Sequence, residues 1–412
     1  MPAEWEPHAA TWLAWPHYEN DWPGKFGPIP WVFAEIISTL APHERVELIV
    51  QDAAAQRQAK KILERADALS DNIRFHRWRT NRVWLRDSGC IFVQCGAGAL
   101  AREKPEPSSH TILPLSKFPR LGKTPRRGAP QFHLVRETPM DPDERNREGH
   151  EFTRANTHRK GRGALAPEAS LAALKWRFNA WAKYSNWRHD EKIGSLMADL
   201  ANVPEIQPVH RNSRIVLEGG SIDVDGQGSL LTTEECLLSK EQQRNPGMTR
   251  RDYEKAFANY LGAPNVIWLG SGIFGDDTHG HVDDLARFVA PGRIVTMVEP
   301  DRRDVNHKPL DDNLRRLKSA RDHAGKPFEI IEIPMPQPVV FEGRRLPASY
   351  ANFYIANNVV LAPVFNRPND RIALNTLAEA FPDREIVPIY SGDFIWGFGA
   401  MHCMTQQQPA SL

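Results

Sequence analysis

The chain has 412 residues, of which 41% are hydrophobic and 25% charged, a composition typical of a folded protein with a sizeable core. Its 52 Lys and Arg residues balance 51 Asp and Glu residues, which argues against a dedicated nucleic-acid binder. The opening residues show no signal peptide, and no stretch approaches the ~18 consecutive apolar residues of a membrane span. We therefore expect a cytoplasmic protein with no membrane or nucleic-acid partner. The length suits two or three domains, or one large α/β barrel or propeller.

Short strands alternate with medium helices along most of the chain. The succession strand, strand, helix, strand recurs at least three times without sequence identity between copies, which predicts radial or solenoid stacking of one unit. The expected elements are a helix at 31–41, a strand at 46–50, a helix at 51–69, extended segments at 72–78 and 84–93, hairpin strands at 221–224 and 228–232 across the two-residue turn Asp225-Gly226, a helix at 250–261, a strand at 265–269, paired strands at 287–289 and 294–298, a helix near 310–323, a strand at 328–333, extended segments at 351–355 and 359–363, a helix at 372–381 and a strand at 385–389.

Residues 96–167 break this pattern. The segment is rich in Pro, Arg, Gly and Ser, with basic clusters at 126–127 and 159–162, and has no helical or alternating period. This composition predicts a flexible surface insertion. The alternative is a basic arm that binds an acidic partner.

Two charged positions lie beside apolar segments in the first half of the chain. Arg86 and Asp87, in Trp84-Leu-Arg-Asp-Ser-Gly89, precede an apolar strand, and charges there need a partner. A structural salt bridge and a ligand site explain the pair equally well. Glu218 ends another apolar stretch before two glycines, which permit close backbone approach.

Two further segments carry reactive residue types. Residues 275–284 contain two His and four Asp, and an extended backbone would place His281 and Asp283 on one face. A histidine beside a carboxylate is suited to proton transfer. Cys403 follows a glycine-rich approach and His402. The four cysteines have no framework spacing and are expected to be free thiols, and the usual role of a lone cysteine is a small buried hydrophobe. The flanking glycines and His402 favour a reactive thiol instead.

One interpretation of these segments is a metal-dependent hydrolase. His279, His281 and Asp283 match the H-x-H-x-D start of some binuclear zinc hydrolases. Against it, Asp284 stands where that motif has another histidine, and Cys403 has no role.

The other interpretation is a thiol enzyme that acts on a planar cation. Cys403 attacks, His281 moves protons, and Asp87, Glu218 and Asp283 surround the substrate. Carboxylates match a guanidinium group bidentately, whereas they suit a neutral or anionic substrate poorly.

The chain resembles the agmatine deiminase family, part of the guanidine-modifying superfamily that includes bacterial-type peptidyl-arginine deiminases. The resemblance covers nearly everything outside 96–167, including the opening MPAEWEPHAATWLAWP, and rests on WLRDSG, LEGGSIDVDGQG with TTEECLL, GDDTHGHVDDLARF, ANFYIANNVVLAPVF and MHCMTQQQP in this order. It implies an α/β fold, a five-bladed pseudo-symmetric propeller (pentein fold) of ββαβ units with the active site on the central axis. Residues 1–412 would form a single catalytic domain that carries the insertion.

The implied reaction is hydrolytic deimination of agmatine to N-carbamoylputrescine and ammonia through an amidino-cysteine intermediate, without cofactor or metal. A peptidyl-arginine or other guanidine deiminase is the nearest alternative. The small cationic substrate would be the partner, together with further copies of the chain in a homo-oligomer. The implied roles are Cys403 as nucleophile, His281 as general acid and base, Glu218 as the group orienting His281, Asp87 and Asp283 as guanidinium clamp, Trp84 as pocket wall and Asp277 as receiver of the distal ammonium.

Four positions depart from the pattern of the family. Cys90 replaces a proline, His279 stands where many members have aspartate, and Phe398 and Ala400 interrupt the usual glycine-rich approach to the nucleophile. None removes a group with an implied catalytic role, so the departures bear on substrate choice rather than on reaction type.

Overall fold

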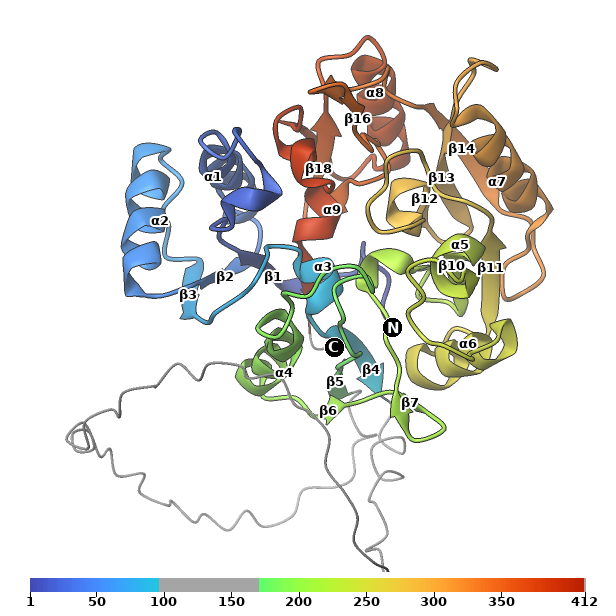
Figure 1. Cartoon of the computed structure of the whole chain (residues 1–412), viewed down its shortest axis with the longest axis horizontal. Helices are drawn as coiled ribbons and strands as arrows, with labels where there is room; N and C mark the ends of the chain where they lie inside the picture. Colours follow the sequence, from blue (N-terminus) through green and yellow to red (C-terminus); the bar gives the residue numbers. More distant parts are fainter. Residues whose placement is uncertain (96–169, 411–412) are drawn as a thin grey trace, which may run out of the picture. The chain divides into compact units, whose positions relative to one another are not determined.

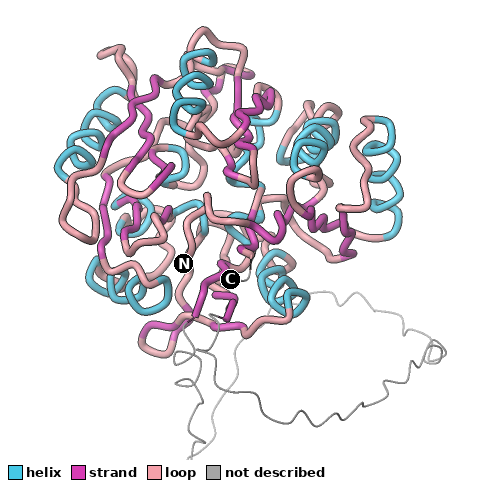
Figure 2. Tube along the Cα trace, turned by 180° about the vertical axis from the view of Figure 1, so that it is seen from behind, coloured by secondary structure: helices cyan, strands magenta, loops and turns pink. Residues whose placement is uncertain are grey.

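The computed structural model describes residues 1–95 and 170–410, which lie in one compact unit, Met1–Ala99 with Glu168–Leu412. The predicted insertion at 96–167 lies outside the described residues. Helices and strands alternate throughout the unit, as Figure 1 and Figure 2 show, and the α/β class is confirmed. No helix within 1–95 or 170–410 is long and apolar enough to cross a membrane.

Four three-stranded sheets share one design. In each, the first two strands pair antiparallel, and the third follows a helix and pairs parallel to the second. Parallel neighbours require such a crossover connection. The predicted recurring unit is therefore confirmed. The first sheet consists of β4 (Ile91–Cys95), β5 (Ser170–Leu174) and β6 (Glu205–Ile206), with helix α4 (Asp190–Ala201). The second consists of β9 (Asp223–Val224), β10 (Ser229–Thr233) and β11 (Asn265–Leu269), with α5 (Glu234–Leu238), α6 (Arg250–Ala256) and the π-helix η3 (Phe257–Leu261). The third consists of β12 (Ala286–Ala290), β13 (Arg293–Val298) and β14 (Glu329–Pro334), with α7 (His307–Ser319), and the fourth of β17 (Tyr354–Ile355), β18 (Val359–Val364) and β19 (Glu385–Tyr390), with α8 (Asp370–Ala380).

The fifth large sheet joins the two ends of the chain. The last strand, β20 (Gln406–Pro409), pairs antiparallel with the first, β1 (His8–Ala14), and places Gln408 opposite Ala10. Two parallel strands, β2 (Arg45–Val50) and β3 (Ile73–Arg77), complete it after helices α1 (Ile29–Leu40) and α2 (Ala53–Arg65). This sheet repeats the strand–strand–helix–strand design with its first strand taken from the opposite end of the sequence.

The core lies between the sheets and the helices that follow their second strands. Helix α7 contacts its own strand β13 and also β11 of the preceding sheet, and α8 contacts β19 and β14 in the same way. Helix α1 packs on β2 and on β18 and β19, and its residues Phe33, Ile36, Ile37 and Leu40 are fully buried. The apolar residues whose spacing predicted this helix form the stripe that the helix buries. Two hairpins, β7 (Val209–His210) with β8 (Ser213–Arg214) and β15 (Val340–Phe341) with β16 (Arg344–Arg345), complete the strands.

Short helices immediately precede the first strands of the sheets. Helix α3 (Leu85–Ser88) leads into β4, η2 (Gly219–Ser221) into β9, η4 (Val282–Asp284) into β12 and α9 (Met401–Met404) into β20. Helix α3 contacts both α9 and η2, and η2 contacts η4. Residues from these four entry points therefore converge, although up to 316 positions separate them, as between Arg86 and His402. Two other short helices are η1 (Glu19–Asp21) and η5 (Phe394–Gly397).

Local hydrogen bonds wind the chain at two places near the site. The prediction of extended backbone at 84–93 is confirmed from Ile91, where β4 begins, and is wrong before it. Residues 85–88 form a helical turn, in which the Ser88 N–H and hydroxyl both donate to the Trp84 carbonyl. Residues 282–284 form a 3₁₀ turn that begins after His281, and Asp276 accepts the N–H groups of Gly280 and His281. His281 and Asp283 still face each other, across a turn rather than along a strand.

The predicted two-residue turn at Asp225-Gly226 is also wrong. Val224 pairs with Leu230, and the Asp225 carboxylate accepts the N–H groups of Gln227 and Ser229. This side chain thus stabilises a longer loop. The remaining predicted helices and strands outside 96–169 are present with shifted ends, and the helix expected at 250–261 ends in a π-helical turn.

Candidate active site

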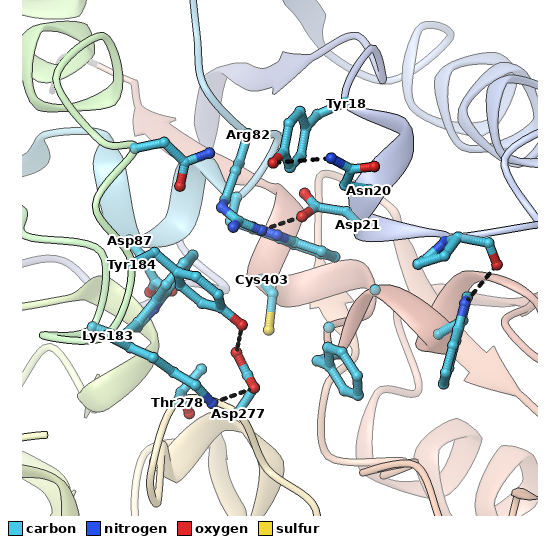
Figure 3. A pocket seen from close by; sticks show the side chains of 18 of the residues that line it. Tyr18, Asn20, Asp21, Arg82, Asp87, Lys183, Tyr184, Asp277, Thr278 and Cys403 are labelled. Atoms are coloured by element: carbon cyan, nitrogen blue, oxygen red, sulfur yellow. Dashed lines mark hydrogen bonds and ion pairs between the residues drawn. The ribbon is translucent and has the colours of Figure 1, made fainter. Parts of the chain in front are cut away.

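A cavity of about 660 Å³ opens on the unit, and four predicted site residues line it (Figure 3). Trp84, Asp87, Asp277 and Cys403 all contribute to its wall. The other predicted groups, His281, Glu218 and Asp283, are fully buried behind this surface. The structure therefore brings together all the residues that the thiol interpretation requires.

Cys403 sits in α9 with its Sγ near two polar side chains. Asn352 Nδ2 donates to Sγ at 3.1 Å, and Sγ lies 3.5 Å from Asp283 Oδ2. Burial, and then the negative charges of Asp283, Asp284 and Asp87, raise the pKa of the Cys403 thiol well above its ordinary value. At neutral pH these groups therefore favour the protonated thiol.

Asn352 organises the backbone around the thiol. Its Oδ1 accepts the N–H groups of His402 and Cys403, at 3.1 and 3.3 Å. Its Nδ2 donates to Cys403 Sγ and, at 3.0 Å, to Asp284 Oδ1. Asn352 lies two residues before β17, so it enters the site as the residues of the short helices do, ahead of the first strand of a sheet.

His281 is surrounded by carboxylates without a hydrogen bond. Its Nδ1 lies 3.9 Å from Asp87 Oδ1 and 4.0 Å from Asp283 Oδ1, and its Nε2 lies 3.9 Å from Glu218 Oε2. Both ring nitrogens are buried without a hydrogen-bond partner among the described residues. Burial disfavours the imidazolium, but Asp87, with Cys236 and Glu218, outweighs it and raises the pKa of His281 well above its ordinary value.

Asp87 presents one oxygen to the protein backbone and the other to an indole. Gly220 N donates to Oδ1 at 3.0 Å and Trp181 Nε1 donates to Oδ2 at 2.8 Å. Burial is the main cause that raises the pKa of Asp87 to about 6, and the nearby His281 opposes it. The carboxylate is held in one orientation by these two donors.

Asp283 is held from behind by a relay that starts near the N-terminus. His402 Nδ1 lies 2.7 Å from Asp283 Oδ2, and His402 Nε2 lies 2.9 Å from Glu4 Oε2. Glu4 also accepts from the buried Arg86 and Arg287, at 3.0 and 2.8 Å. Burial favours the neutral acid, but His402 outweighs it and lowers the pKa of Asp283.

Glu218 is paired with a buried arginine. Arg244 Nε lies 3.1 and 3.3 Å from the two carboxylate oxygens, and both side chains are fully buried. Burial favours the neutral acid, but Arg244 and His281 outweigh it and lower the pKa of Glu218. Glu218 is thus an anion that faces His281 from the side opposite Asp87 and Asp283.

The mouth of the cavity carries two ion pairs. Asp277 accepts from Lys183 Nζ and from the Tyr184 hydroxyl, each at 2.6 Å (Figure 3). Arg82 pairs with Asp21 on the same wall. The predicted receiver of a distal ammonium therefore lies in the cavity, with both of its oxygens engaged.

The structure does not bring together the three ligands of the metal interpretation. The His279 side chain contacts Ser239 Oγ at 3.1 Å and Glu235 at 3.8 Å, and lines a different cavity. His279 adopts a left-handed backbone conformation, with a φ of 65°. His279, His281 and Asp283 therefore do not form a common ligand set.

The sequence and the structure have counterparts among known proteins. The family model of the Porphyromonas-type peptidyl-arginine deiminases matches residues 1–111 and 155–409. The chain belongs to this family. Membership places it among the hydrolases that act on carbon–nitrogen bonds of guanidine groups.

Three relatives of this deiminase family align over the whole chain. A Legionella pneumophila protein, provisionally named an agmatine deiminase, is 31% identical over 100% of this chain and 95% of its own length. The structure of Enterococcus faecalis agmatine deiminase matches with a TM-score of 0.76 and 25% identity over 100% of this chain and 96% of that one. An agmatine deiminase of C. jejuni with a cysteine-to-serine substitution, solved with substrate bound, matches with a TM-score of 0.73, 25% identity and the same coverage.

Five residues that shape the site had no assigned role in the sequence. They are Glu4, Trp181, Arg244, Asn352 and His402. His402 was noted only as a neighbour of the thiol, and Asn352 lies inside a segment expected to be extended. The sequence pattern that could have indicated them is a polar residue beside an apolar segment, the same pattern that indicated Asp87 and Glu218.

Proposed function

We propose that the chain hydrolyses agmatine to N-carbamoylputrescine and ammonia, and so takes part in the formation of putrescine. The observation that carries the proposal is a thiol and a buried set of carboxylates around one cavity, with Cys403 and Asp87 on its wall and Asp283 and Glu218 behind it. Carboxylates arranged in this way suit a planar guanidinium cation. The names of the relatives support agmatine as the first substrate to test.

We also propose that the described unit is a five-bladed propeller within a single catalytic domain. Five large sheets repeat one design, and one sheet closes the first strand on the last. Asp87, Glu218, Asp283, Asn352 and Cys403 each lie two to five residues before the first strand of a different sheet. A pseudo-fivefold arrangement explains why these five entry points meet.

The first half of the proposed reaction forms a bond between sulfur and carbon. Asp87 and Asp283 hold the guanidinium group, the Cys403 thiol loses its proton to solvent, and the resulting thiolate adds to the central carbon of the guanidinium. The tetrahedral adduct collapses as His281 gives its proton to one amino group, which leaves as ammonia. An S-alkylthiouronium cation remains on Cys403, and His281 is now neutral.

The substrate itself supplies the charge that the thiolate needs. Burial and three neighbouring carboxylates raise the pKa of Cys403. A guanidinium cation between Asp87 and Asp283 offsets this negative field, so its arrival lowers the pKa of the thiol. A thiol that titrates below pH 7 in the free enzyme would contradict this step.

The second half releases the product. His281 takes a proton from water, the resulting hydroxide adds to the thiouronium carbon, and the carbon–sulfur bond breaks to give the Cys403 thiolate and the ureido product. The hydroxyl proton of that product passes to solvent, where it converts the released ammonia to ammonium. Glu218 stabilises the imidazolium that His281 becomes, 3.9 Å from its Nε2. The reaction consumes one water and releases one ammonia.

Peptidyl-arginine deimination is the second candidate, and the name of the matching family favours keeping it. Ammonia release should be measured in parallel with agmatine, free arginine and a peptide-internal arginine. Turnover of agmatine at the highest kcat/KM supports the proposal, and turnover of only the peptide overturns it. Activity that survives Cys403→Ala and is lost with a chelator would contradict the thiol mechanism.

A further inference from the structure

The distal end of the proposed agmatine site already holds an ammonium group. Lys183 Nζ lies 2.6 Å from Asp277 Oδ1, and the Tyr184 hydroxyl donates to Asp277 Oδ2 at 2.6 Å. In Figure 3 both side chains meet Asp277 within the cavity that contains Cys403 and Asp87. Each oxygen of this carboxylate therefore already accepts a hydrogen bond from the protein, and one of the two donors is a cation.

The residues just before Lys183 have an uncommon backbone conformation that leads Lys183 to Asp277. Residues 180–182 have φ values of 51°, 58° and 53°, although none is glycine, and such a left-handed run is unfavourable for L residues. Contacts of Trp181, the middle residue, hold the segment. Trp181 Nε1 donates to Asp87, and Gln242 Nε2 donates to the backbone carbonyls of Trp181 and Asp277, each at 3.2 Å. Strain of this kind persists where surrounding contacts over-determine it, often at ligand sites.

We propose that Lys183 is an internal competitor for the distal cation subsite, and that agmatine binds by exchanging its own ammonium for that of Lys183 on Asp277. This inference rests on the proposed function. The two cations have the same chemistry, and two ammonium groups held side by side on Asp277 would repel each other. The Lys183 side chain is 37% exposed, against 11% for Asp277, so Lys183 can move into water while Asp277 stays.

The exchange makes Lys183 a specificity-determining residue. A guanidine without a distal charge leaves the Lys183–Asp277 pair intact, whereas agmatine must break it. An ion pair with one exposed partner is weak, so the lysine lowers the apparent affinity for agmatine by about two- to fivefold rather than preventing binding.

The test compares agmatine with n-butylguanidine, which has the same chain and no ammonium group. Lys183→Met should raise the ratio of kcat/KM for agmatine to kcat/KM for n-butylguanidine by about two- to fivefold. Lys183→Arg keeps the cation and should leave the ratio near that of the wild type. Lys61→Met, at an exposed position of α2, is the matched control. An unchanged or lowered ratio in Lys183→Met would overturn the inference, because Lys183 would then be inert or would support agmatine binding.

Direct binding separates this inference from the proposed function. Calorimetry measures agmatine binding to Cys403→Ala with and without Lys183→Met. Tighter binding to the double variant supports the exchange even if the wild type releases no ammonia from agmatine, a result that would refute only the proposed function. Equal or weaker binding overturns the exchange, whatever the turnover.

Discussion

Gly220 lies against three predicted catalytic groups at once, and Gly220→Ala tests their placement. A Cβ atom there would lie 2.6 Å from His281 Nδ1, 2.9 Å from Asp283 Oδ2 and 3.1 Å from Asp87 Oδ1. Ordinary contact begins at 3.4 Å, so the imidazole must retreat by about 0.8 Å and the Asp283 carboxylate by about 0.5 Å. Misplacement of about 1 Å at a reacting centre costs on the order of 100-fold in rate, and we expect kcat/KM for agmatine to fall by about that factor.

The assay is ammonia release with purified variants, together with a thermal melt. Gly220 does not adopt a left-handed backbone, so alanine is compatible with its conformation, and the variant should fold. Gly27→Ala is the matched control, since no atom lies within 4 Å of a Cβ built there. A folded Gly220→Ala variant with kcat/KM within about threefold of the wild type would refute the placement of these groups.

Three further predictions concern the pH profile, the thiol and the buried relay. The pKa of Asp87 is raised to about 6, so its carboxyl is neutral below that pH and cannot pair with a guanidinium. The value of kcat/KM for agmatine should therefore fall about tenfold per pH unit below pH 6. A fall that begins only near pH 4 would contradict this assignment. Asn352→Leu removes the donor to Cys403 Sγ and the acceptor for two backbone N–H groups, and should lower kcat at least about tenfold; unchanged kcat would show that this amide has no role. Glu4→Gln removes the carboxylate that Arg86, Arg287 and His402 share, and leaves the buried Arg86 without an anionic partner among the described residues. The change should lower the free energy of unfolding in urea by about 3–5 kcal/mol, whereas a loss below about 1 kcal/mol would contradict the relay.

The elements that the sequence predicts well are those with a hydrophobic period. The apolar stripe of α1 and the largely apolar segment Val46–Val50 of β2 are visible in the sequence, and both elements are present. The four-residue turns α3 and α9 have no period to detect, and hydrogen bonds to a nearby carbonyl decide them. The fifth sheet escaped notice because its first strand comes from the opposite end of the chain.

The site residues also divide into those that the sequence indicates and those that it does not. Asp87, Glu218 and Cys403 are visible because an unusual polar residue stands beside an apolar segment. Their partners are not visible in the sequence, because only the folded structure buries them and brings them together from distant positions. Arg244 is 26 residues from Glu218, and Asn352 is 51 residues from Cys403. The sequence alone does not distinguish an arginine or asparagine that contacts water from one that contacts a buried partner.

The central claim is that Cys403 forms a covalent bond with the substrate carbon. Enzyme turning over agmatine is quenched with acid, digested and analysed by mass spectrometry. The account predicts that the peptide containing Cys403 gains the mass of agmatine minus ammonia, that the peptides of Cys90 and Cys236 do not, and that Cys403→Ser gives no such adduct. Turnover without an adduct on Cys403, or an adduct on another cysteine, would contradict it.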